Sequence, residues 1–305
     1  MVKKPKNKKT KPKKNTDSEY FEKSPTIRKK LLLIISIIVV ICIIVFVWFT
    51  LYSNLAKAEA TAQLIVESGS VQVKQSGGTW TIAENGTILH QSDSVKTGDK
   101  SYASIIFFGS SIVRLDSNTE VTLQELLKDI DETSVKINQD AGRTWNTVSK
   151  ISGIDNYEVH TPTTVASVRG TSFDFYILAN GNITISVFNG TVNITTYKDG
   201  KIVNSLEVPE YLSTSIDPNN LDETPETKPV EEDDWINENL QEDEELREDL
   251  KAELYKRIDP FKPELKNLYN VTDQELEILV DAYLNGDFEL PPNTPEWARK
   301  LFEFS

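Results

Sequence analysis

The side chains that most often bind metals or carry catalysis are scarce in this chain of 305 residues. His90 and His160 are its only histidines and Cys42 is its only cysteine, and all three lie far apart in the sequence. A protein metal site needs several His, Cys or carboxylate ligands that converge, usually at short spacing. We therefore expect no metal and no cofactor, and we interpret both histidines as surface residues.

Motifs for nucleophilic catalysis and for calcium binding are missing as well. A serine hydrolase of the common α/β type would show a G-x-S-x-G turn around its nucleophile, and the sequence contains none. Asp93, Asp99 and Asp116 lack the D-x-D-x-D-G spacing of a calcium loop. We predict that the chain has no catalytic residues and is not an enzyme.

One stretch has the composition of a specialised corner: HTPTTVASVRGTSFDFYI, residues 160–177. Gly170 allows a backbone conformation that a Cβ would forbid. Arg169 could bind an anion with two hydrogen bonds, or it could reach carbonyl groups of neighbouring strands. A phosphate loop is excluded, because three spaced glycines, a lysine and a following helix are absent. We predict instead that Arg169 is buried against packed strands and holds the corner together.

Short runs of alternating apolar and polar residues surround this stretch, from residue 64 to residue 216. Alternation with a period of two is the pattern of strands that bury one face. The runs are separated by pairs that favour tight turns, namely Gly77-Gly78, Asn85-Gly86, Asn180-Gly181, Asn189-Gly190 and Asp199-Gly200. The sequence therefore predicts an all-β domain over 64–216, with no strong helix inside it.

The N-terminus combines a basic tail with a long apolar run. Residues 1–30 hold twelve Lys or Arg against three acidic residues, and the run from Leu31 to Tyr52 carries no charge. At about 1.5 Å per residue, a helix of this length covers roughly 33 Å, enough for a bilayer core of about 30 Å. The positive-inside rule then places the tail in the cytoplasm and the rest of the chain outside. We predict a single-pass protein of the cell membrane, with a disordered tail at 1–30, a transmembrane helix at 31–52 and a stalk at 53–63.

Two other interpretations of the N-terminus compete with this one. A signal peptide cleaved near Ala58 would use the small residues Ala56 and Ala58, but the apolar run is much longer than the usual 7–15 or so residues. A tail that binds nucleic acid would be expected to carry aromatic residues among its lysines, or a fold that presents the charges. We favour the uncleaved anchor and expect no nucleic-acid partner.

The composition changes again after the β-domain. Residues 217–234 are rich in proline and acidic residues, which predicts a solvated linker. Residues 235–305 then show apolar residues at helical spacing, and Thr272 and Glu275 are placed as a helix capping box. We predict a small helical region without a large core of its own. The acidic run 231–249 is interpreted as a solvated linker or helix face.

Residues 160–173, HTPTTVASVRGTSF, resemble the signature of the FecR domain family. Other pieces resemble the family in the same order along the chain, at 97–103, 113–115, 118–120, 142–145, 157–159 and 187–192. Together they cover about 65–208, and the ordered set is far more specific than any one piece. The resemblance implies a twisted, β-solenoid-like stack of strands. The predicted fold class is therefore mainly β, with one N-terminal transmembrane helix, a β-solenoid-like domain and a small C-terminal helical region.

The resemblance also implies a set of signature residues, expected to be structural and available for contact with a partner. They are Thr161, Pro162, Arg169, Gly170, Thr171 and Phe173.

Two functions follow from the resemblance. In the first, the chain is a membrane-anchored, non-catalytic protein whose extracytoplasmic domain binds an envelope protein or a cell-wall polymer. In the second, it is a transmembrane regulator that relays external binding to a cytoplasmic partner, as the iron-uptake regulators of the family do with a sigma factor. Those regulators carry a longer cytoplasmic segment with Trp-rich helices. The tail of this chain is about thirty Lys-rich residues without a Trp, so the sequence favours the first function.

Overall fold

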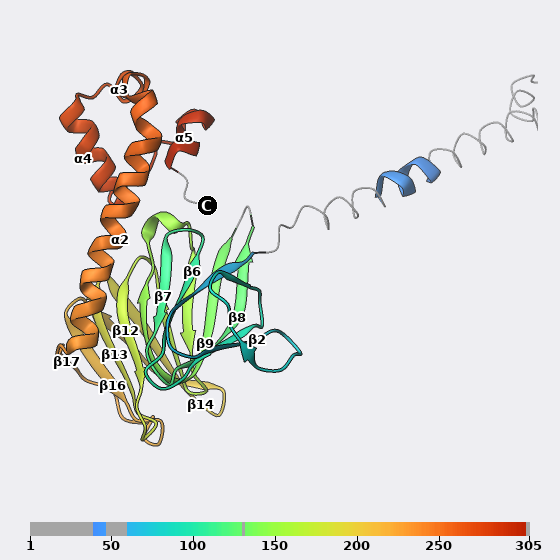
Figure 1. Ribbon diagram of the computed structural model, residues 1–305, viewed down its shortest axis with the longest axis vertical. Coiled ribbons are helices and arrows are strands. Elements are labelled where there is room, and N and C mark those ends of the chain that lie inside the picture. The colour runs from blue at the N-terminus through green and yellow to red at the C-terminus, as the bar shows by residue number, and fades with distance from the viewer. Residues whose placement is uncertain (1–38, 47–59, 130–131, 303–305) are drawn as a thin grey trace, which may run out of the picture. The chain divides into compact units, whose positions relative to one another are not determined.

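The computed structural model describes residues 39–46, 60–129 and 132–302 (Figure 1). The chain divides into two compact units, Met1–Ala58 and Glu59–Ser305. In the first unit, residues 39–46 form a helix with exposed apolar side chains. Within the described ranges, no helix is long and apolar enough to cross a membrane. The basic tail, most of the predicted span from Leu31 to Tyr52 and most of the predicted stalk lie outside the described residues.

In the described part of the second unit, seventeen strands come first, and hydrogen bonds join them into one large mixed sheet. Their bounds are β1 Ala62–Ser68, β2 Val71–Lys74, β3 Thr81–Ile82, β4 Thr87–Leu89, β5 Ser94–Thr97, β6 Tyr102–Phe107, β7 Ser111–Leu115, β8 Glu120–Lys128, β9 Thr133–Thr147, β10 Asn156–His160, β11 Thr164–Val168, β12 Ser172–Ile177, β13 Ile183–Asn189, β14 Thr191–Lys198, β15 Lys201–Pro209, β16 Leu212–Ile216 and β17 Thr227–Pro229. A 3₁₀ turn, η1 Lys150–Ser152, follows β9. The prediction of a mainly β domain is confirmed.

The strands form two layers that share one strand. Layer A has the order β4-β1-β6-β7-β9-β12-β13-β16-β17, and layer B has the order β3-β2-β5-β8-β9-β10-β11-β14-β15. Among the described strands, only β9 and β10 pair in parallel. In both layers, the strands that precede β9 in the chain lie on one side of it, and those that follow lie on the other.

Strand β9 crosses from one layer to the other at Gly142. Its first part pairs with β8 and β10 in layer B, and residues 142–147 pair with β7 and β12 in layer A. Gly142 has a φ of +81°, and a Cβ on it would meet the Cα of Thr119 at 2.5 Å. Glycine is therefore required here for two reasons, the left-handed backbone and the close approach of a neighbouring turn.

Alternating side chains from the two layers meet in a single core. Phe173 and Ile105 of layer A and Val121, Ile137 and Val159 of layer B are almost completely buried in one cluster. The outward residues of the same strands are mostly polar, so the period-two pattern of the sequence reports directly which side chains face the core.

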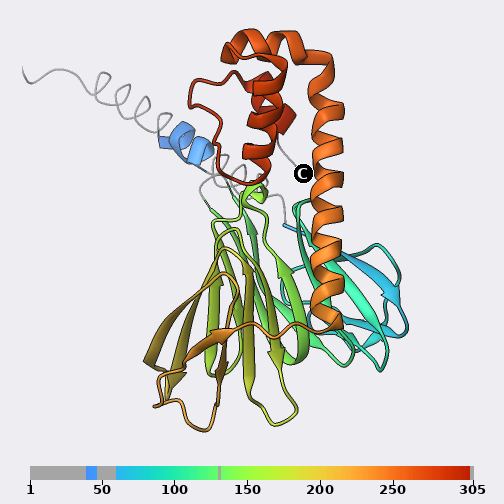
Figure 2. The ribbon, with the colours of Figure 1, turned by 90° about the vertical axis from the view of Figure 1, so that its left-hand side faces the viewer.

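Helices follow the strands. Their bounds are α2 Asp234–Ile258, η2 Asp259–Phe261, α3 Lys262–Tyr269, α4 Asp273–Leu284 and α5 Glu296–Phe302. The N-terminal half of α2 lies against layer A, and the rest of it extends past the strand ends and packs with α3, α4 and α5 around a small apolar cluster (Figures 1 and 2). We call the C-terminal half of α2 together with α3–α5 the helical head. The predicted capping box is present, because Thr272 and Glu275 bond reciprocally at the start of α4.

Two segments differ from the sequence-based prediction. Residues 62–63 of the expected stalk belong to β1, where Ala62 is buried and pairs with Leu89 and Phe107. The expected linker at 217–234 holds the edge strand β17, and its Leu221 is buried in the core. The three side chains of β17 are all exposed. Only main-chain hydrogen bonds to β16 hold this strand, so its sequence shows no alternation of apolar and polar residues.

Candidate functional site

The outer face of layer A carries a row of charged and aromatic side chains. Register places Arg114 of β7 and Asp174 of β12 on either side of Trp145 of β9. Side chains alternate between the faces of a strand, so Arg143 and Thr147 point to the same outer face as Trp145. All five residues lie at most partly exposed, because helix α2 covers them.

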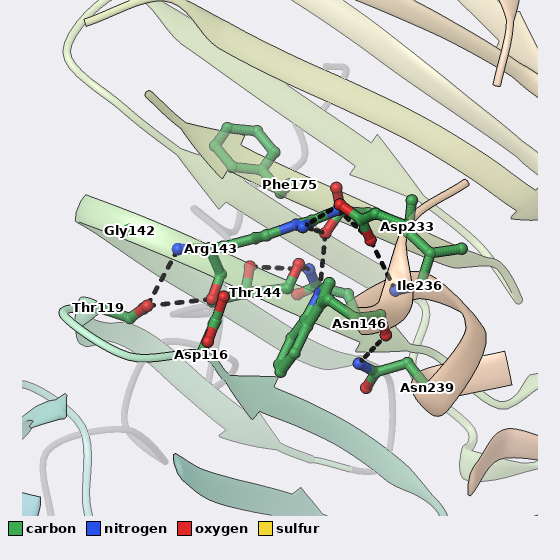
Figure 3. A network of polar contacts seen from close by, with 12 residues as sticks. Asp116, Thr119, Gly142, Arg143, Thr144, Asn146, Phe175, Asp233, Ile236 and Asn239 are labelled. Atoms are coloured by element: carbon green, nitrogen blue, oxygen red, sulfur yellow. Dashed lines mark hydrogen bonds and ion pairs between the residues drawn. The ribbon is translucent and has the colours of Figure 1, made fainter. Parts of the chain in front are cut away.

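Arg143 joins the sheet to the start of α2. Its Nε donates to Oδ1 of Asp174 at 2.7 Å, and its Nη1 donates to Oδ2 of Asp233 at 2.7 Å. Asp233 is also the N-cap of α2, where its carboxylate accepts from the amide of Ile236 at 2.9 Å. One guanidinium thus bridges a strand carboxylate and a helix cap, as Figure 3 shows for Arg143, Asp233 and Ile236.

Asp243 makes the second junction, two to three turns further along α2. Its carboxylate accepts from Arg114 Nη1 at 2.6 Å, from Trp145 Nε1 at 3.0 Å and from Thr147 Oγ1 at 2.6 Å. The neighbouring Glu242 pairs with Nε of Arg114 at 2.6 Å. Charged hydrogen bonds of this kind are about twice as strong as neutral ones, so they define the register of α2 on the sheet.

Apolar contacts fill the space between the two junctions. Trp145 is completely buried and its ring centroid lies 4.9 Å from that of Phe188. Ile236 of α2 completes this small cluster, and Trp235 donates from Nε1 to Asp174 at 3.2 Å. We call the layer A residues Arg114, Arg143, Trp145, Asp174 and Phe188 the α2 seat.

The carboxylates of this interface have shifted pKa values in opposite directions. Burial raises the pKa of Asp174 to about 6, although the bond from Arg143 opposes the rise. Burial also favours the neutral form of Asp233, but there the bonds from Arg143 and Ile236 prevail and lower the pKa. Asp174 therefore takes up a proton more readily than Asp233 does.

The acidic run 231–249 was expected to be solvated, which is so for most of its carboxylates but not for Asp243. Asp233 and Asp243 face the sheet and pair with buried arginines, whereas Glu244, Glu245 and others of the run are exposed. Composition alone does not distinguish the two groups. A sequence signal for this interface does exist. Arg143 and Trp145 are two residues apart in one strand, so a charge and a large ring lie on the same outer face, and such a face is expected to pack against another element.

The signature residues lie at both ends of β11 and do not form a single site, since Thr161 and Pro162 precede the strand and Arg169, Gly170 and Thr171 follow it. Phe173 and Thr171 are buried, and Thr171 Oγ1 donates to the carbonyl of Thr191 at 3.2 Å. Thr161 accepts from the amide of Thr164 at 3.0 Å and closes the turn before β11. Pro162 is exposed.

The prediction that Arg169 is buried was wrong. Thr164, Ala166 and Val168 are buried along β11, so the next position in the alternation points outward, and Arg169 is exposed. The predicted special backbone at Gly170 is confirmed, with a φ of +68°. Arg169 instead lines a cavity of about 570 Å³ together with Asp155 of the β-domain and Arg299 of the helical head.

Lys150 marks the contact between the β-domain and the helical head. A Cβ added to Gly170 or to Gly286 would collide with the aliphatic stem of this lysine, so the stem runs between two glycines from different parts of the fold. Its Nζ lies 3.9 Å from Asp287. On the other side of Lys150 is a cavity of about 380 Å³, bounded by strand ends of layer A and by α2.

The remaining candidates for chemistry stay apart. His160 bonds to Glu158 at 2.6 Å and His90 lies 3.7 Å from Asp93, and both histidine side chains are partly exposed. Within residues 39–46, 60–129 and 132–302, no three His, Cys, Asp or Glu side chains are grouped as metal ligands.

Comparison with known proteins identifies the domain. Residues 93–193 match the family model described as FecR protein, so the resemblance seen in the sequence is confirmed over this part of the chain. No curated protein matches the chain in sequence.

Two crystal structures of a candidate anti-sigma factor from Parabacteroides distasonis are similar to the chain. The identities are 15% and 16%, and the TM-scores are 0.37 and 0.36. Each similarity covers 45% of this chain and 60% of the other.

Proposed function

We infer that the chain, which carries a FecR domain at residues 93–193, is a non-catalytic binding protein of the cell envelope. The observation that carries this proposal is the contrast between two arginines of the FecR-like pieces. Arg143 is buried, and its hydrogen bonds hold α2 on the sheet. Arg169, by contrast, is exposed beside a cavity. The signature corner thus offers a guanidinium to a partner, and the other polar groups of the motif are engaged in holding the fold.

The membrane anchor is the part of the proposal that depends on the N-terminal sequence. The uncharged run from Leu31 to Tyr52 and the basic residues before it support a single span with the FecR domain outside. Protease added to intact cells should then degrade the FecR domain and leave an N-terminal tag protected. A domain that stays intact while a control surface protein is cleaved would refute this orientation.

The binding role can be tested through Arg169. Full-length protein in detergent is used to capture partners from an envelope extract, with Arg169→Glu as the variant and Lys201→Glu, an exposed residue of β15, as the charge-matched control. We expect the Arg169 variant to melt like the parent and to lose the captured protein or polymer, and the control to keep it. Equal capture by all three proteins would exclude the signature corner as the contact.

The second candidate function is a transmembrane regulator, which the FecR family and the predicted topology favour. In such a protein the tail would have to recognise a cytoplasmic partner. Replacing residues 1–27 by an unrelated Lys-rich sequence keeps the charge that orients the span and removes any specific contact. Unchanged behaviour of the cells supports the binding protein, and loss of a transcriptional response supports the regulator.

The solenoid-like stack implied by the family remains part of this proposal. It is supported by the way the chain returns to each layer in turn, for example from β13 in layer A to β14 in layer B and back to β16.

A further inference from the structure

The cavity of about 380 Å³ between layer A and α2 has the size of a small-ligand site, for which about 300–1,000 Å³ is usual. Its floor is formed by the ends of β9, β12 and β13 and by the turn before β7. Its wall is formed by α2 and the end of α4. Its lining includes Ser110, Thr147, Ser149, Ser172, Leu250 and Leu284.

One hydroxyl of the floor has no partner. Ser110 is completely buried, and its Oγ makes no hydrogen bond within the part of the chain that the structure describes. Buried polar groups without a partner are rare in folded proteins and call for an explanation such as a water or a ligand. Ser110 is among the residues around the cavity, and a turn of its side chain brings the hydroxyl within reach of a ligand there.

The charges around the cavity are already balanced. Asp243 pairs with Arg114 at 2.6 Å, Arg247 lies 3.6 Å from Glu244, and Lys150 lies 3.9 Å from Asp287. Each of these charges has an oppositely charged neighbour, so an ionic ligand would compete with an ion pair within the protein. The cavity therefore favours a neutral ligand.

The main chain of the floor is also satisfied. Thr147, Ser172 and Asn189 pair across β9, β12 and β13, and Val148 and Thr171 exchange both of their main-chain hydrogen bonds. A peptide that extends a sheet needs free main-chain groups, and this floor offers the side chains of Ser172 and Asn189 instead, while the hydroxyl of Thr147 is bonded to Asp243. Hydroxyls both donate and accept hydrogen bonds, which suits a ligand that carries several hydroxyls of its own. Leu250 and Leu284 on the opposite wall suit its C–H face.

We propose that this cavity binds a neutral sugar, either the end or a short segment of a glycan. The proposal rests on the envelope-binding role inferred above and names the chemistry of one ligand. The sugar site lies in a different cavity from the one beside Arg169. The sugar proposal and the partner contact proposed at Arg169 can therefore fail separately.

The test is ligand-observed NMR on the full-length protein in a detergent without a sugar headgroup. The probes are maltotriose and the β-1,4-linked trimer of N-acetylglucosamine, with glucuronic acid and trialanine as charged and peptide comparators. We expect at least one neutral trisaccharide to bind, with a dissociation constant in the millimolar range or below, and neither comparator to bind. No saccharide binding, or binding of trialanine alone, overturns the proposal.

Two variants assign any binding to the cavity. Ser172→Phe fills the space, and we expect it to abolish saccharide binding, whereas Ser167→Phe, the same change at a half-buried serine of β11, retains it. Ser110→Ala removes the orphan hydroxyl, so it should weaken binding by about three- to tenfold, as the loss of one hydrogen bond does, without lowering the melting temperature. Binding that survives Ser172→Phe in a folded protein places the ligand elsewhere and overturns the proposal. If Ser110→Ala binds the saccharide with unchanged affinity, the Ser110 hydroxyl does not contact the ligand.

Discussion

At the scale of single residues, the two arginines of the FecR-like pieces allow a matched comparison. Arg143→Ala leaves the buried carboxylate of Asp174 without its main partner, and we expect the free energy of unfolding to fall by about 3–5 kcal/mol. Arg169→Ala removes an exposed side chain, and we expect a change within about 0.5 kcal/mol. Urea denaturation measures both. Similar losses in the two variants would contradict the burial seen for each.

Glycine at the crossing of β9 can be tested against glycine in an open turn. Gly142 and Gly200 both have positive φ, +81° and +73°, but only Gly142 has neighbours that a Cβ would strike. Gly200→Ala should cost about 1–3 kcal/mol of stability through backbone strain alone. Gly142→Ala should cost clearly more, because Thr119 must also move. If thermal denaturation shows equal losses of stability in the two variants, the close approach of Thr119 to Gly142 does not contribute to the cost.

Asp174 links stability to pH. Because burial raises its pKa from the ordinary 3.8 to about 6, the folded protein binds this proton more tightly than the unfolded chain does. Its contribution to stability is therefore largest below about pH 4 and is lost as the pH rises through 6, a change on the order of 3 kcal/mol.

We predict that Asp174→Asn removes this decline. Urea denaturation of the variant at a series of pH values between 4 and 6 should give a flatter profile than the parent, and Asp99→Asn, an exposed control, should keep the parental slope. Identical slopes in the parent and the Asp174 variant would show that the group does not titrate in this range.

At the scale of elements, α2 depends on Asp243 for its position. This carboxylate accepts from three donors on layer A, two of which belong to the buried residues Arg114 and Trp145. Asp243→Ala should therefore weaken the docking of α2 by about 3–5 kcal/mol, with faster amide exchange along the N-terminal half of the helix. Glu245→Ala, an exposed residue of the same helix, serves as the control. Unchanged exchange in Asp243→Ala would mean that apolar contacts hold α2 alone.

Elements with local signals were predictable from the sequence, and those held by distant contacts were not. Gly181, Gly190 and Gly200 have the positive φ expected of their turn pairs, and α4 starts at the capping box that Thr272 and Glu275 predict. The α2 seat, by contrast, joins Arg143 to Asp233 across 90 residues and Arg114 to Asp243 across 129. Nothing within a short window of sequence specifies such pairs.

The same limit explains the misplaced residue of the candidate site. The sequence identified the Arg169–Gly170 corner and its special backbone, because a glycine beside an alternating run is a local feature. It did not show which side of β11 would be covered. Arg169 was expected inside, while Arg114 and Arg143 turned out to be buried. Their partners include Asp243 and Asp233, which belong to an acidic run that looked solvated.

At the scale of the whole second unit, strand β9 determines how the protein is expected to unfold. It lies in the middle of both layers, with partners on each side along nearly its whole length. Neither layer has a seam along which it could open while the other stays closed. In each layer, the strands before β9 and the strands after it are joined by main-chain hydrogen bonds only through this one strand.

Unfolding should therefore be a single event in which both layers lose their amide protection together, at one rate, whatever probe reports it. Hydrogen exchange under conditions that favour global opening is expected to release amides of β6 and of β11 in step, and a Gly142→Ala chain is expected to speed both equally. Two well-separated rates for the two strands would instead indicate two independent halves. Strand β9 thus makes the two layers and the two halves of the domain depend on one another, and damage anywhere along it is expected to lower the stability of the whole unit.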